Sequence, residues 1–294
     1  HPGPSVSVEA WVSLDPTVAV DYAPIAARWD GSYELDVALL DDLPPGPLGL
    51  LVAPAPVDEA EDPLQGGVGG PSQHVGVERD VRGGGRPWQE RLTHVLAANG
   101  LSQGPARVKI LLTRGAVEGL GLPTAGRPTR VIYAQPYIPP SSAEYAAGWP
   151  VVVFPEGRTT FVGRHKSLNY LFYLAARQFA QDQGAREALI LEADGLVSEG
   201  AATSLIYLHQ GQYYRPDSAS ALPGVSAAVL GRGLAARGMS LKARRTTVAQ
   251  LKASEGLWLA NSLMGLMPVA AIDGAPMPVN ATTAFLQAVW ADMS

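Results

Sequence analysis

The stretch DGLVSEGAATSLIYL, Asp194 to Leu208, decides the fold that this sequence predicts. The apolar run EALIL leads into it, and the Asp-Gly pair is typical of a tight turn between two strands. QYYRP follows across a His-Gln-Gly turn and predicts another strand. These strands lie too close together in the chain for a simple series of βαβ units. The sequence therefore predicts a mixed fold, α/β or α+β.

Helices and further strands surround this stretch. The span 88–100 predicts a helix that Gly100 ends, and the span 167–184 predicts one that stops at Gly184. A loop and then a helix are expected over 222–238, and Asn280 is expected to cap a last helix that runs through Trp290. Strand patterns occur at SVSVEAWVSL, ARVKILLTRG, VIYAQPYIPP, WPVVVF and LWLANSLMGLMPVAAIDG.

The length of 294 residues suggests two domains, at roughly 150 residues per domain. The Pro-rich span 139–150 is the expected linker. It would separate a smaller N-terminal α/β domain, 1–138, from a larger C-terminal domain, 151–294. Within the first domain the span 58–87 carries GGVGG and RGGGR, and this composition predicts a loop or a disordered insert.

The composition argues against several classes of function. The formal net charge of −5 offers no basic surface for nucleic acid. The absence of cysteine excludes disulfides, thiolate metal ligands and a cysteine nucleophile. No apolar run approaches the roughly 20 residues of a membrane span, and the first residues do not resemble a signal peptide. We expect a cytoplasmic protein that has no membrane or nucleic-acid partner.

Three motifs that would indicate other chemistry are absent or out of context. The five histidines, at 1, 74, 94, 165 and 209, do not have the spacing of metal ligands. No G-x-S-x-G nucleophile elbow occurs. The glycines of GRGLAARG, 231–238, approach dinucleotide-binding spacing, but they lie in a predicted helix and do not follow a strand, which indicates helix packing instead.

Two charged residues stand at candidate reactive positions. Lys166, in GRHKSLNYL, lies between an apolar strand and an apolar helix, where desolvation can lower the pKa of its amine and make it a nucleophile. The alternative is a solvated lysine at the start of a helix. Glu199 lies among apolar residues on a short strand, and if buried it needs a partner such as a protonated ring nitrogen. The alternative is an exposed glutamate in a turn.

Two loops are candidate anion sites. Leu222-Pro223-Gly224-Val225-Ser226 leads into a helix, so its backbone N–H groups and the positive helix end suit a phosphate. An ordinary Pro-Gly turn with Ser226 as the cap explains the same residues. Asn261-Ser262 follows an apolar strand, and its small polar side chains suit the same phosphate or form a plain turn.

The four pieces together match the needs of pyridoxal 5′-phosphate (PLP). A lysine forms a Schiff base with the cofactor, a carboxylate keeps the pyridine nitrogen protonated, and two loops anchor the phosphate. No one of the four indicates this cofactor by itself.

The same residues resemble the fold-type IV PLP enzymes, the branched-chain aminotransferase-like family that includes D-amino acid aminotransferases. HKSLNYL resembles the lysine motif of this family, and DGLVSEGAATSLIYL resembles its D-G-x-V-x-E segment. LPGVSAAVL and ANSLMGLMPV resemble its two phosphate loops. The matches come in family order and cover roughly residues 88–290, so their coincidence is much more specific than any one motif.

The resemblance assigns roles residue by residue. Lys166 would be the Schiff-base lysine and proton shuttle, and Glu199 would pair with the pyridine nitrogen. The resemblance also implies two α/β domains with the site between them, and a homodimer. The remaining cofactor-binding positions, at the ring or in the phosphate loops, would be Leu222, Gly224, Val225, Ser226, Asn261 and Ser262.

The last loop indicates a branch of the family. Asn-Ser-Leu-Met is similar to the loop of the aminodeoxychorismate lyases, and Asn169, three positions after Lys166, fits the lyase and D-amino-acid aminotransferase branches. The expected function is therefore a PLP-dependent lyase that acts on a small amine, 4-amino-4-deoxychorismate, and releases 4-aminobenzoate and pyruvate in folate synthesis. The alternatives are an aminotransferase of D- or branched-chain amino acids and a non-catalytic relative.

The sequence departs from the family in its N-terminal half. It lacks the F-x-T-x-R strand and the H-L-x-R-L helix, whose arginine holds the phosphate in the family. Ser204 stands where the family usually has Asn, and Ala227 follows the phosphate loop where the family has Arg. Arg107, Lys109 and Arg114 lie on or beside one predicted strand, as substrate-carboxylate ligands or as charges that flank a core.

Overall fold

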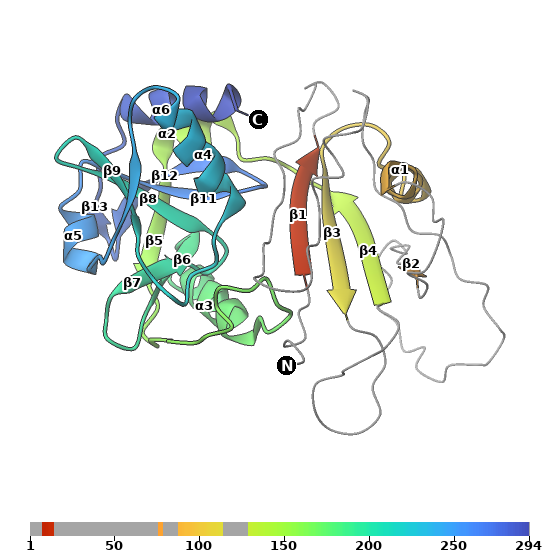
Figure 1. Ribbon diagram of the computed structural model, residues 1–294, viewed down its shortest axis with the longest axis horizontal. Helices are drawn as coiled ribbons and strands as arrows, with labels where there is room; N and C mark the ends of the chain where they lie inside the picture. The colour runs from red at the N-terminus through yellow and green to blue at the C-terminus, as the bar shows by residue number, and fades with distance from the viewer. Residues whose placement is uncertain (1–7, 15–75, 79–87, 114–128, 294) are drawn as a thin grey trace. The chain divides into compact units, whose positions relative to one another are not determined.

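The computed structural model describes residues 8–14, 76–78, 88–113 and 129–293 (Figure 1). These residues divide into two compact units, one up to Ile138 and one from Pro139 onward. The mixture of strands and helices confirms the expected fold class.

The first unit contains an antiparallel sheet with the strand order β1-β3-β4-β2. Helix α1 packs against it through a small core of Val95, Leu96, Ala106, Val108, Ile132 and Ala134. Gly100 has a φ of +68° and ends the helix as the sequence predicted. The elements are β1 (Val8–Leu14), β2 (Gly76–Glu78), α1 (Trp88–Ala98), β3 (Ala106–Thr113) and β4 (Thr129–Pro136).

Two expectations concern spans near this unit. The glycine-rich span 58–87 lies outside the described residues apart from 76–78, which form β2. The span 139–150, expected as a linker, contains helix α2 (Ser142–Ala147) and the first residues of β5. Ser141 and Glu144 form a capping box at this helix, which explains why a short Pro-flanked span is helical.

The second unit is built on one mixed sheet with the strand order β10-β9-β8-β11-β12-β5-β6-β7, and β13 pairs with β12. Strand β5 is parallel to both of its neighbours, while β8, β11 and β12 pair antiparallel. The strands are β5 (Trp149–Val153), β6 (Glu187–Leu191), β7 (Val197–Gly200), β8 (Ser204–His209), β9 (Gln212–Pro216), β10 (Leu241–Arg244), β11 (Gly256–Asn261), β12 (Gly265–Ile272) and β13 (Ala275–Pro276).

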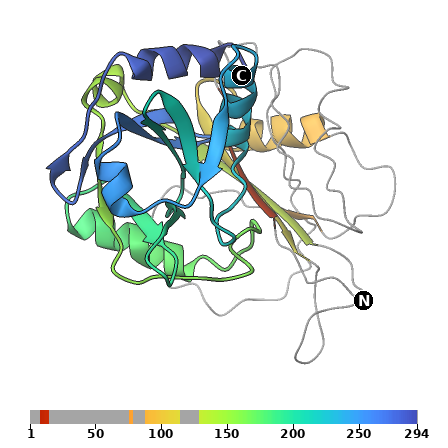
Figure 2. The same ribbon diagram turned by 60° about the vertical axis from the view of Figure 1, so that its left-hand side comes forward.

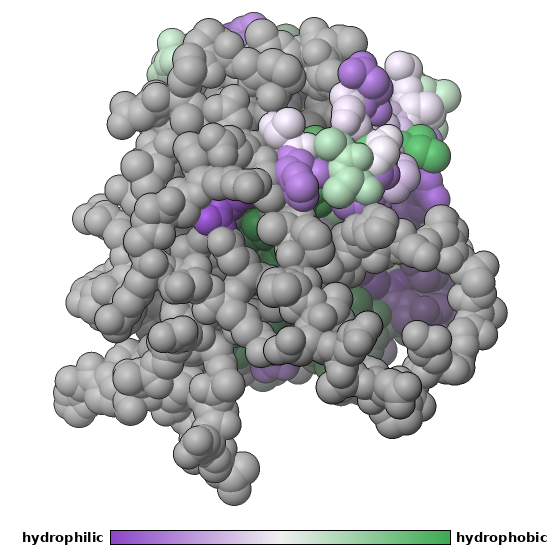
Figure 3. All heavy atoms as spheres, turned by 90° about the vertical axis from the view of Figure 1, so that its right-hand side faces the viewer, coloured by the Kyte–Doolittle hydropathy of each residue, from purple (hydrophilic) through white to green (hydrophobic). Residues whose placement is uncertain are grey.

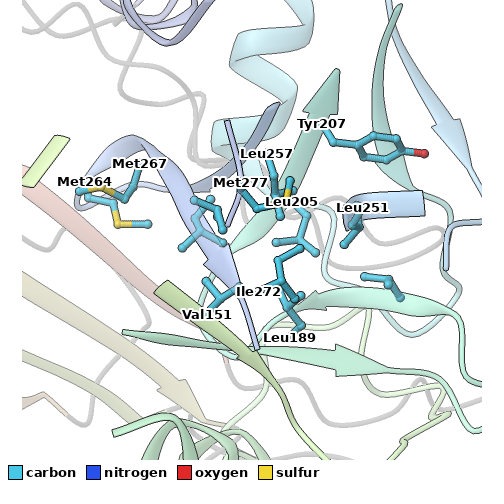
Figure 4. Close-up of a cluster of buried hydrophobic side chains, with 13 residues drawn as sticks. Val151, Leu189, Leu205, Tyr207, Leu251, Leu257, Met264, Met267, Ile272 and Met277 are labelled. Atoms are coloured by element: carbon cyan, nitrogen blue, oxygen red, sulfur yellow. The ribbon is translucent and has the colours of Figure 1, made fainter. Parts of the chain in front are cut away.

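Both faces of the central strands are buried, because successive side chains of a strand point to opposite faces. Leu205 and Tyr207 face an inner core around which the sheet curls, while Ile206 between them faces a helix layer. Strand β11 alternates in the same way, with Leu257 inward and Trp258 outward. This explains the uninterrupted apolar runs of these strands. The inner core, shown in Figure 4, is made of Val151, Leu189, Val197, Leu205, Tyr207, Leu251, Leu257, Leu259, Met264, Met267, Val269, Ile272 and Met277.

Helices cover the outer face of this sheet in two places (Figures 1 and 2). Helix α3 packs Ala176 and Ala180 against β5 and β6. Helices α4 and α6 pack against β8, β11 and β12 and against each other. A Cβ on Gly233 of α4 would lie 2.6 Å from Val289 of α6, which confirms that GRGLAARG serves helix packing. The helices are α3 (Leu171–Asp182), α4 (Val225–Ala235), α5 (Val248–Lys252) and α6 (Thr282–Ala291).

Two helix starts differ from the expectation. Helix α3 begins at Leu171, because Ser167 and Tyr170 instead donate backbone hydrogen bonds to His165 and Leu168 in local turns. Helix α6 begins at Thr282 with Ala281 as its N-cap, and Asn280, expected as the cap, lies one residue earlier. The Asn280 side chain still accepts a hydrogen bond from the Thr282 N–H, at 3.0 Å.

The described part of the chain contains no helix that is both long and apolar enough to cross a membrane. Figure 3, viewed from the side on which Figure 1 draws α1, shows described residues of both hydrophilic and hydrophobic character.

Candidate functional site

The centre of the candidate site is the Glu199 carboxylate on β7. Glu199 pairs with Ile190 of β6, and its exposed fraction is 8%. Two donors hold the carboxylate. The Tyr173 hydroxyl donates to Oε1 at 2.9 Å, and the Leu222 backbone N–H donates to Oε2 at 3.0 Å. Because each oxygen accepts one hydrogen bond, the plane of the carboxylate is fixed, while each oxygen keeps further acceptor capacity.

The Glu199 carboxyl changes its protonation state near neutral pH. Burial raises the pKa of Glu199 to about 7, although the hydrogen bonds from Leu222 and Tyr173 and the positive charge of Lys166 act to lower it. The charge of Glu187 adds to the increase. A group balanced in this way is typical of functional sites, and a cationic ligand at the carboxylate would shift it to the ionised form.

Lys166 lies in the loop 154–170 between β5 and α3, where it is partly buried. This loop packs against the segment that precedes α4. A Cβ on Gly163 would lie 1.9 Å from the Ser220 carbonyl oxygen, and the Thr160 N–H donates to Ser220 Oγ at 3.0 Å. The positive charge of Lys166 acts on Glu199 and lowers its pKa. The amine is therefore near enough to the carboxylate to interact with it electrostatically.

A second carboxylate, Glu192, anchors this loop. The hydroxyls of Thr159 and Ser220 donate to its Oε2 at 2.7 and 2.9 Å, and Ser218 donates to Oε1. Burial opposes the ionisation of Glu192, but these hydrogen bonds outweigh it, and the pKa of the carboxyl is lowered. Glu192 thus ties the Lys166 loop to the segment that carries Leu222.

The N-terminus of α4 forms the candidate anion cradle. Gly224 is the N-cap, and no side chain caps the helix. The N–H groups of the first turn, at Val225, Ser226 and the following residue, therefore have no helical partner. A Cβ on Gly224 would lie 2.1 Å from Ser204 Oγ, so any larger residue here would force the Ser204 hydroxyl to move. Ser226 is buried, with an exposed fraction of 4%.

The start of β8 lies beside the cradle through Ser204, and it pairs with the end of β11. Ser204 pairs with Ala260, and Asn261 Nδ2 donates to the Ala202 carbonyl at 3.3 Å. Asn261 Oδ1 accepts from the backbone N–H groups of Leu263 and Met264, both at 3.0 Å. The Asn261 side chain therefore shapes the loop.

The structure connects several of the predicted site residues to the segment 222–226. Glu199 accepts a hydrogen bond from Leu222, and the charge of Lys166 acts on Glu199. Gly224 approaches Ser204 at the start of β8, which pairs with the end of β11, while Ser262 follows β11 and is exposed. Distant parts of the chain thus contribute to one site in the second unit.

Sequence reasoning missed Tyr173 and Glu192. Tyr173 follows Lys166 by seven positions, and because α3 begins only at Leu171, helical spacing does not relate them. Glu192 directly follows β6 and resembles any polar residue at a strand end. Tyr173 acts through its contact with Glu199, 26 positions away in the chain. Glu192 acts through hydroxyl groups from two loops, 26 or more positions away. No local sequence pattern reveals such contacts.

The residues fit PLP by the chemistry of their donors. A partly buried amine suits the carbonyl group of the cofactor, and a buried carboxylate with a pKa near neutrality suits a protonated ring nitrogen. The glycine cradle at an uncapped helix suits a phosphate. Within the described ranges, no three His, Asp or Glu side chains are grouped so that they could hold a metal ion.

Comparisons with known proteins agree with this chemistry. The family model described as amino-transferase class IV matches residues 85–272, more than half of the chain. The aminodeoxychorismate lyase of Bacillus subtilis (strain 168) is 25% identical over 189 residues, 63% of each chain. The D-alanine aminotransferase of Bacillus licheniformis is 27% identical over 110 residues, which are 37% of this chain and 38% of that enzyme. The chain spans less than two thirds of the first of these curated relatives, and as little as 19% of others.

Solved structures share the fold. A putative 4-amino-4-deoxychorismate lyase from Legionella pneumophila superposes with a TM-score of 0.62 at 22% identity, and the match covers 70% of this chain and 76% of that one. The branched-chain amino acid aminotransferase of Escherichia coli gives a TM-score of 0.58 at 22% identity, over 66% of this chain and 65% of that one. Another branched-chain amino acid aminotransferase of the same fold, with a TM-score of 0.60, is complexed with N-(5′-phosphopyridoxyl)-L-glutamate.

Proposed function

The chain belongs to the class IV aminotransferase family, whose enzymes use PLP, and on this premise we propose that it is a lyase that converts 4-amino-4-deoxychorismate to 4-aminobenzoate and pyruvate. The observation that carries the proposal is the loop after β11. Asn261 folds Asn-Ser-Leu-Met into a compact turn beside the start of β8, and this is the loop sequence that resembles the lyase branch. The match to the Bacillus subtilis lyase, over 189 residues, supports it.

When bound, PLP supplies a carbonyl group that condenses with an amine and a ring that takes up the electron pair of a bond broken beside that amine. We assign Lys166 to hold the cofactor and then, as a free amine, to remove the proton from the amine-bearing carbon of the substrate. Glu199 would keep the ring nitrogen protonated, and the hydrogen bonds from Tyr173 and Leu222 fix its carboxylate for this role.

The remaining proposed ligands hold the cofactor in place. Leu222 would lie against the ring, and the backbone of Gly224, Val225 and Ser226 would bind the phosphate together with the hydroxyls of Ser226 and Ser262.

The reaction balances without a second substrate. The C–H bond at the amine-bearing carbon breaks and the C–O bond to the enolpyruvyl group breaks. The enolpyruvyl oxygen leaves with its electron pair, the released group takes up a proton to become pyruvate, and the remaining ring becomes aromatic. Lys166 is the group that carries the proton. Neither an oxidant nor a keto acid is required.

An aminotransferase of D- or branched-chain amino acids is the second candidate. The match to the D-alanine aminotransferase of Bacillus licheniformis supports it. It would use the same lysine and the same carboxylate. It differs in that the amine is kept and passed to a keto acid, so the two functions separate by their need for an acceptor.

The test is to incubate purified protein, PLP and aminodeoxychorismate with and without a keto acid, and to measure 4-aminobenzoate. We expect formation at the same rate in both mixtures. Turnover of a D- or branched-chain amino acid, seen only with a keto acid, together with no 4-aminobenzoate, would replace the lyase by the aminotransferase. If neither reaction occurs and PLP gives no visible absorption band with the protein, the chain is a non-catalytic relative.

Two further expectations stay predictions. The family resemblance implies a homodimer, which sedimentation equilibrium of the purified chain would test. The role in folate synthesis and a cytoplasmic location follow from the proposed reaction and from the sequence, and localisation of a tagged full-length protein would test the second.

A further inference from the structure

We propose that Tyr173 is a positioning residue for the cofactor, because its hydroxyl orients the Glu199 carboxylate toward the ring nitrogen. This inference rests on the use of PLP by the family and does not depend on the choice between lyase and aminotransferase. Tyr173 lies in the first turn of α3, the helix that follows the Lys166 loop. One short segment therefore carries both the amine and the residue that holds the carboxylate.

The hydroxyl of Tyr173 acts as a donor to Glu199. Its oxygen lies 2.9 Å from Glu199 Oε1. Burial and the neighbouring Glu199 charge raise the pKa of the Tyr173 phenol above its ordinary value, so the hydroxyl keeps its proton. The Leu222 N–H holds the other oxygen. Without the Tyr173 hydroxyl, only the Leu222 N–H would restrain rotation of the carboxylate about the Cγ–Cδ bond of Glu199.

The ring of Tyr173 is itself held firmly. Phe172 packs edge-on against it, with centroids 5.6 Å apart and planes at 90°. The Arg158 guanidinium lies 5.3 Å from the centroid of the Tyr173 ring and 5.0 Å from that of Phe172. Because these contacts involve the ring and not the hydroxyl, Tyr173→Phe should keep the packing and remove only the hydrogen bond.

Other charged groups also act on this pair, and a test has to separate them. The groups whose fields reach Tyr173 or Glu199 are Arg158 and Lys166 from the loop before α3, and Glu187 and Glu192 from β6 and its end. None of them changes in Tyr173→Phe, so a comparison of two ligands in the same variant isolates the hydroxyl. The ligands we choose are PLP and its 1-deaza analogue, which has a C–H group in place of the ring nitrogen.

The experiment measures the dissociation constants of both ligands for the apo forms of the wild type and of Tyr173→Phe. We expect PLP to bind roughly tenfold more weakly to the variant, the effect of one hydrogen bond to a charged group, and the 1-deaza analogue to bind with unchanged affinity. The matched control is Tyr207→Phe, which removes another buried tyrosine hydroxyl, one that is hydrogen-bonded to Thr246 at 2.8 Å and not to Glu199. It should change neither affinity.

A cycle with Glu199→Gln tests whether Tyr173 acts through the carboxylate. We expect Tyr173→Phe to have almost no further effect on PLP affinity in the Glu199→Gln background, because coupled residues are not additive. Equal weakening of both ligands, full additivity in the cycle, or failure of Tyr173→Phe to fold would each overturn the proposal. Loss of the lyase reaction alone would not, since binding is measured without turnover.

Discussion

The burial of Glu199 predicts a specific dependence of stability on pH. The pKa of this carboxyl is about 7 in the folded chain, against 4.5 for an unburied glutamate. Below pH 4.5 both the folded and the unfolded chain carry the proton. Between pH 4.5 and 7 the unfolded chain releases it while the folded chain keeps it, so the stabilisation declines as the pH rises and is lost above 7.

The magnitude follows from the shift in pKa. At about 1.4 kcal/mol per pKa unit, Glu199 should make the apo protein about 3 kcal/mol less stable at pH 7.5 than at pH 4.5. Glu199→Gln removes this titration and preserves the local contacts. Its amide oxygen can accept from the Leu222 N–H, and its amide nitrogen can donate to the Tyr173 hydroxyl oxygen.

The assay is urea unfolding of both apo proteins at pH 4.5, 6 and 7.5. The free energy of unfolding of the wild type minus that of Glu199→Gln should fall by about 3 kcal/mol across this range. Other titrating groups cancel in the difference. Glu192→Gln is the control of opposite sign and is measured below pH 4.5 as well, because the stabilisation from the lowered pKa of Glu192 is present above the unfolded pKa and is lost as the pH falls through the folded pKa. If the unfolding free energies of the wild type and Glu199→Gln changed in parallel with pH, Glu199 would not titrate with a raised pKa in the folded chain.

Three glycines give further predictions. Gly224→Ala should destabilise the fold by about 1–3 kcal/mol in urea unfolding and weaken PLP binding, because the added Cβ lies 2.1 Å from Ser204 Oγ. A second substitution in the same chain, Ser204→Ala, removes this oxygen and should restore much of the stability and of the PLP affinity. Gly163→Ala should reduce turnover without such a rescue, since its Cβ would meet the Ser220 backbone oxygen at 1.9 Å; an unchanged rate would show that the Lys166 loop can shift freely. Gly184→Ala meets no neighbour within 4 Å, so thermal unfolding should show only the backbone cost of its φ of +71°, about 1 kcal/mol.

Local features of the fold were predictable because local chemistry determines them. Gly100, Gly184 and Gly195 all adopt positive φ where the sequence placed helix ends and a strand turn. The apolar runs of β6, β8 and β11 became buried strands, since their charged and amide residues and His209 stand only at the strand ends. These elements follow from the residue types within a few positions of each other.

Boundaries set by competing hydrogen bonds were not predictable. The apolar character of SLNYL favoured a helix from Ser167, but the Ser167 side chain accepts from the Asn169 N–H at 3.3 Å, and serine hydroxyls can compete with helix formation in this way. The helix therefore starts later, and the residues after Lys166 form a loop. This loop, with its contact to Ser220, is what carries Lys166 into the site.

The site itself was predictable only in part. Four weak patterns in order located the segments, but their assembly depends on contacts between distant residues. The hydrogen bond between Tyr173 and Glu199 and the close approach of Gly224 to Ser204 arise only when strands and loops pack together. The arginine that the family uses for phosphate was not found in the sequence, and part of the N-terminal half lies outside the described residues.

The lyase reaction is tested by measuring both products of aminodeoxychorismate with purified protein and PLP in the absence of any keto acid. We expect 4-aminobenzoate and pyruvate in equal amounts, no product with Lys166→Ala, and unchanged turnover with Lys242→Ala, which alters an exposed lysine on β10. No product from the wild type would contradict the lyase, and full turnover by Lys166→Ala would contradict the role of this lysine.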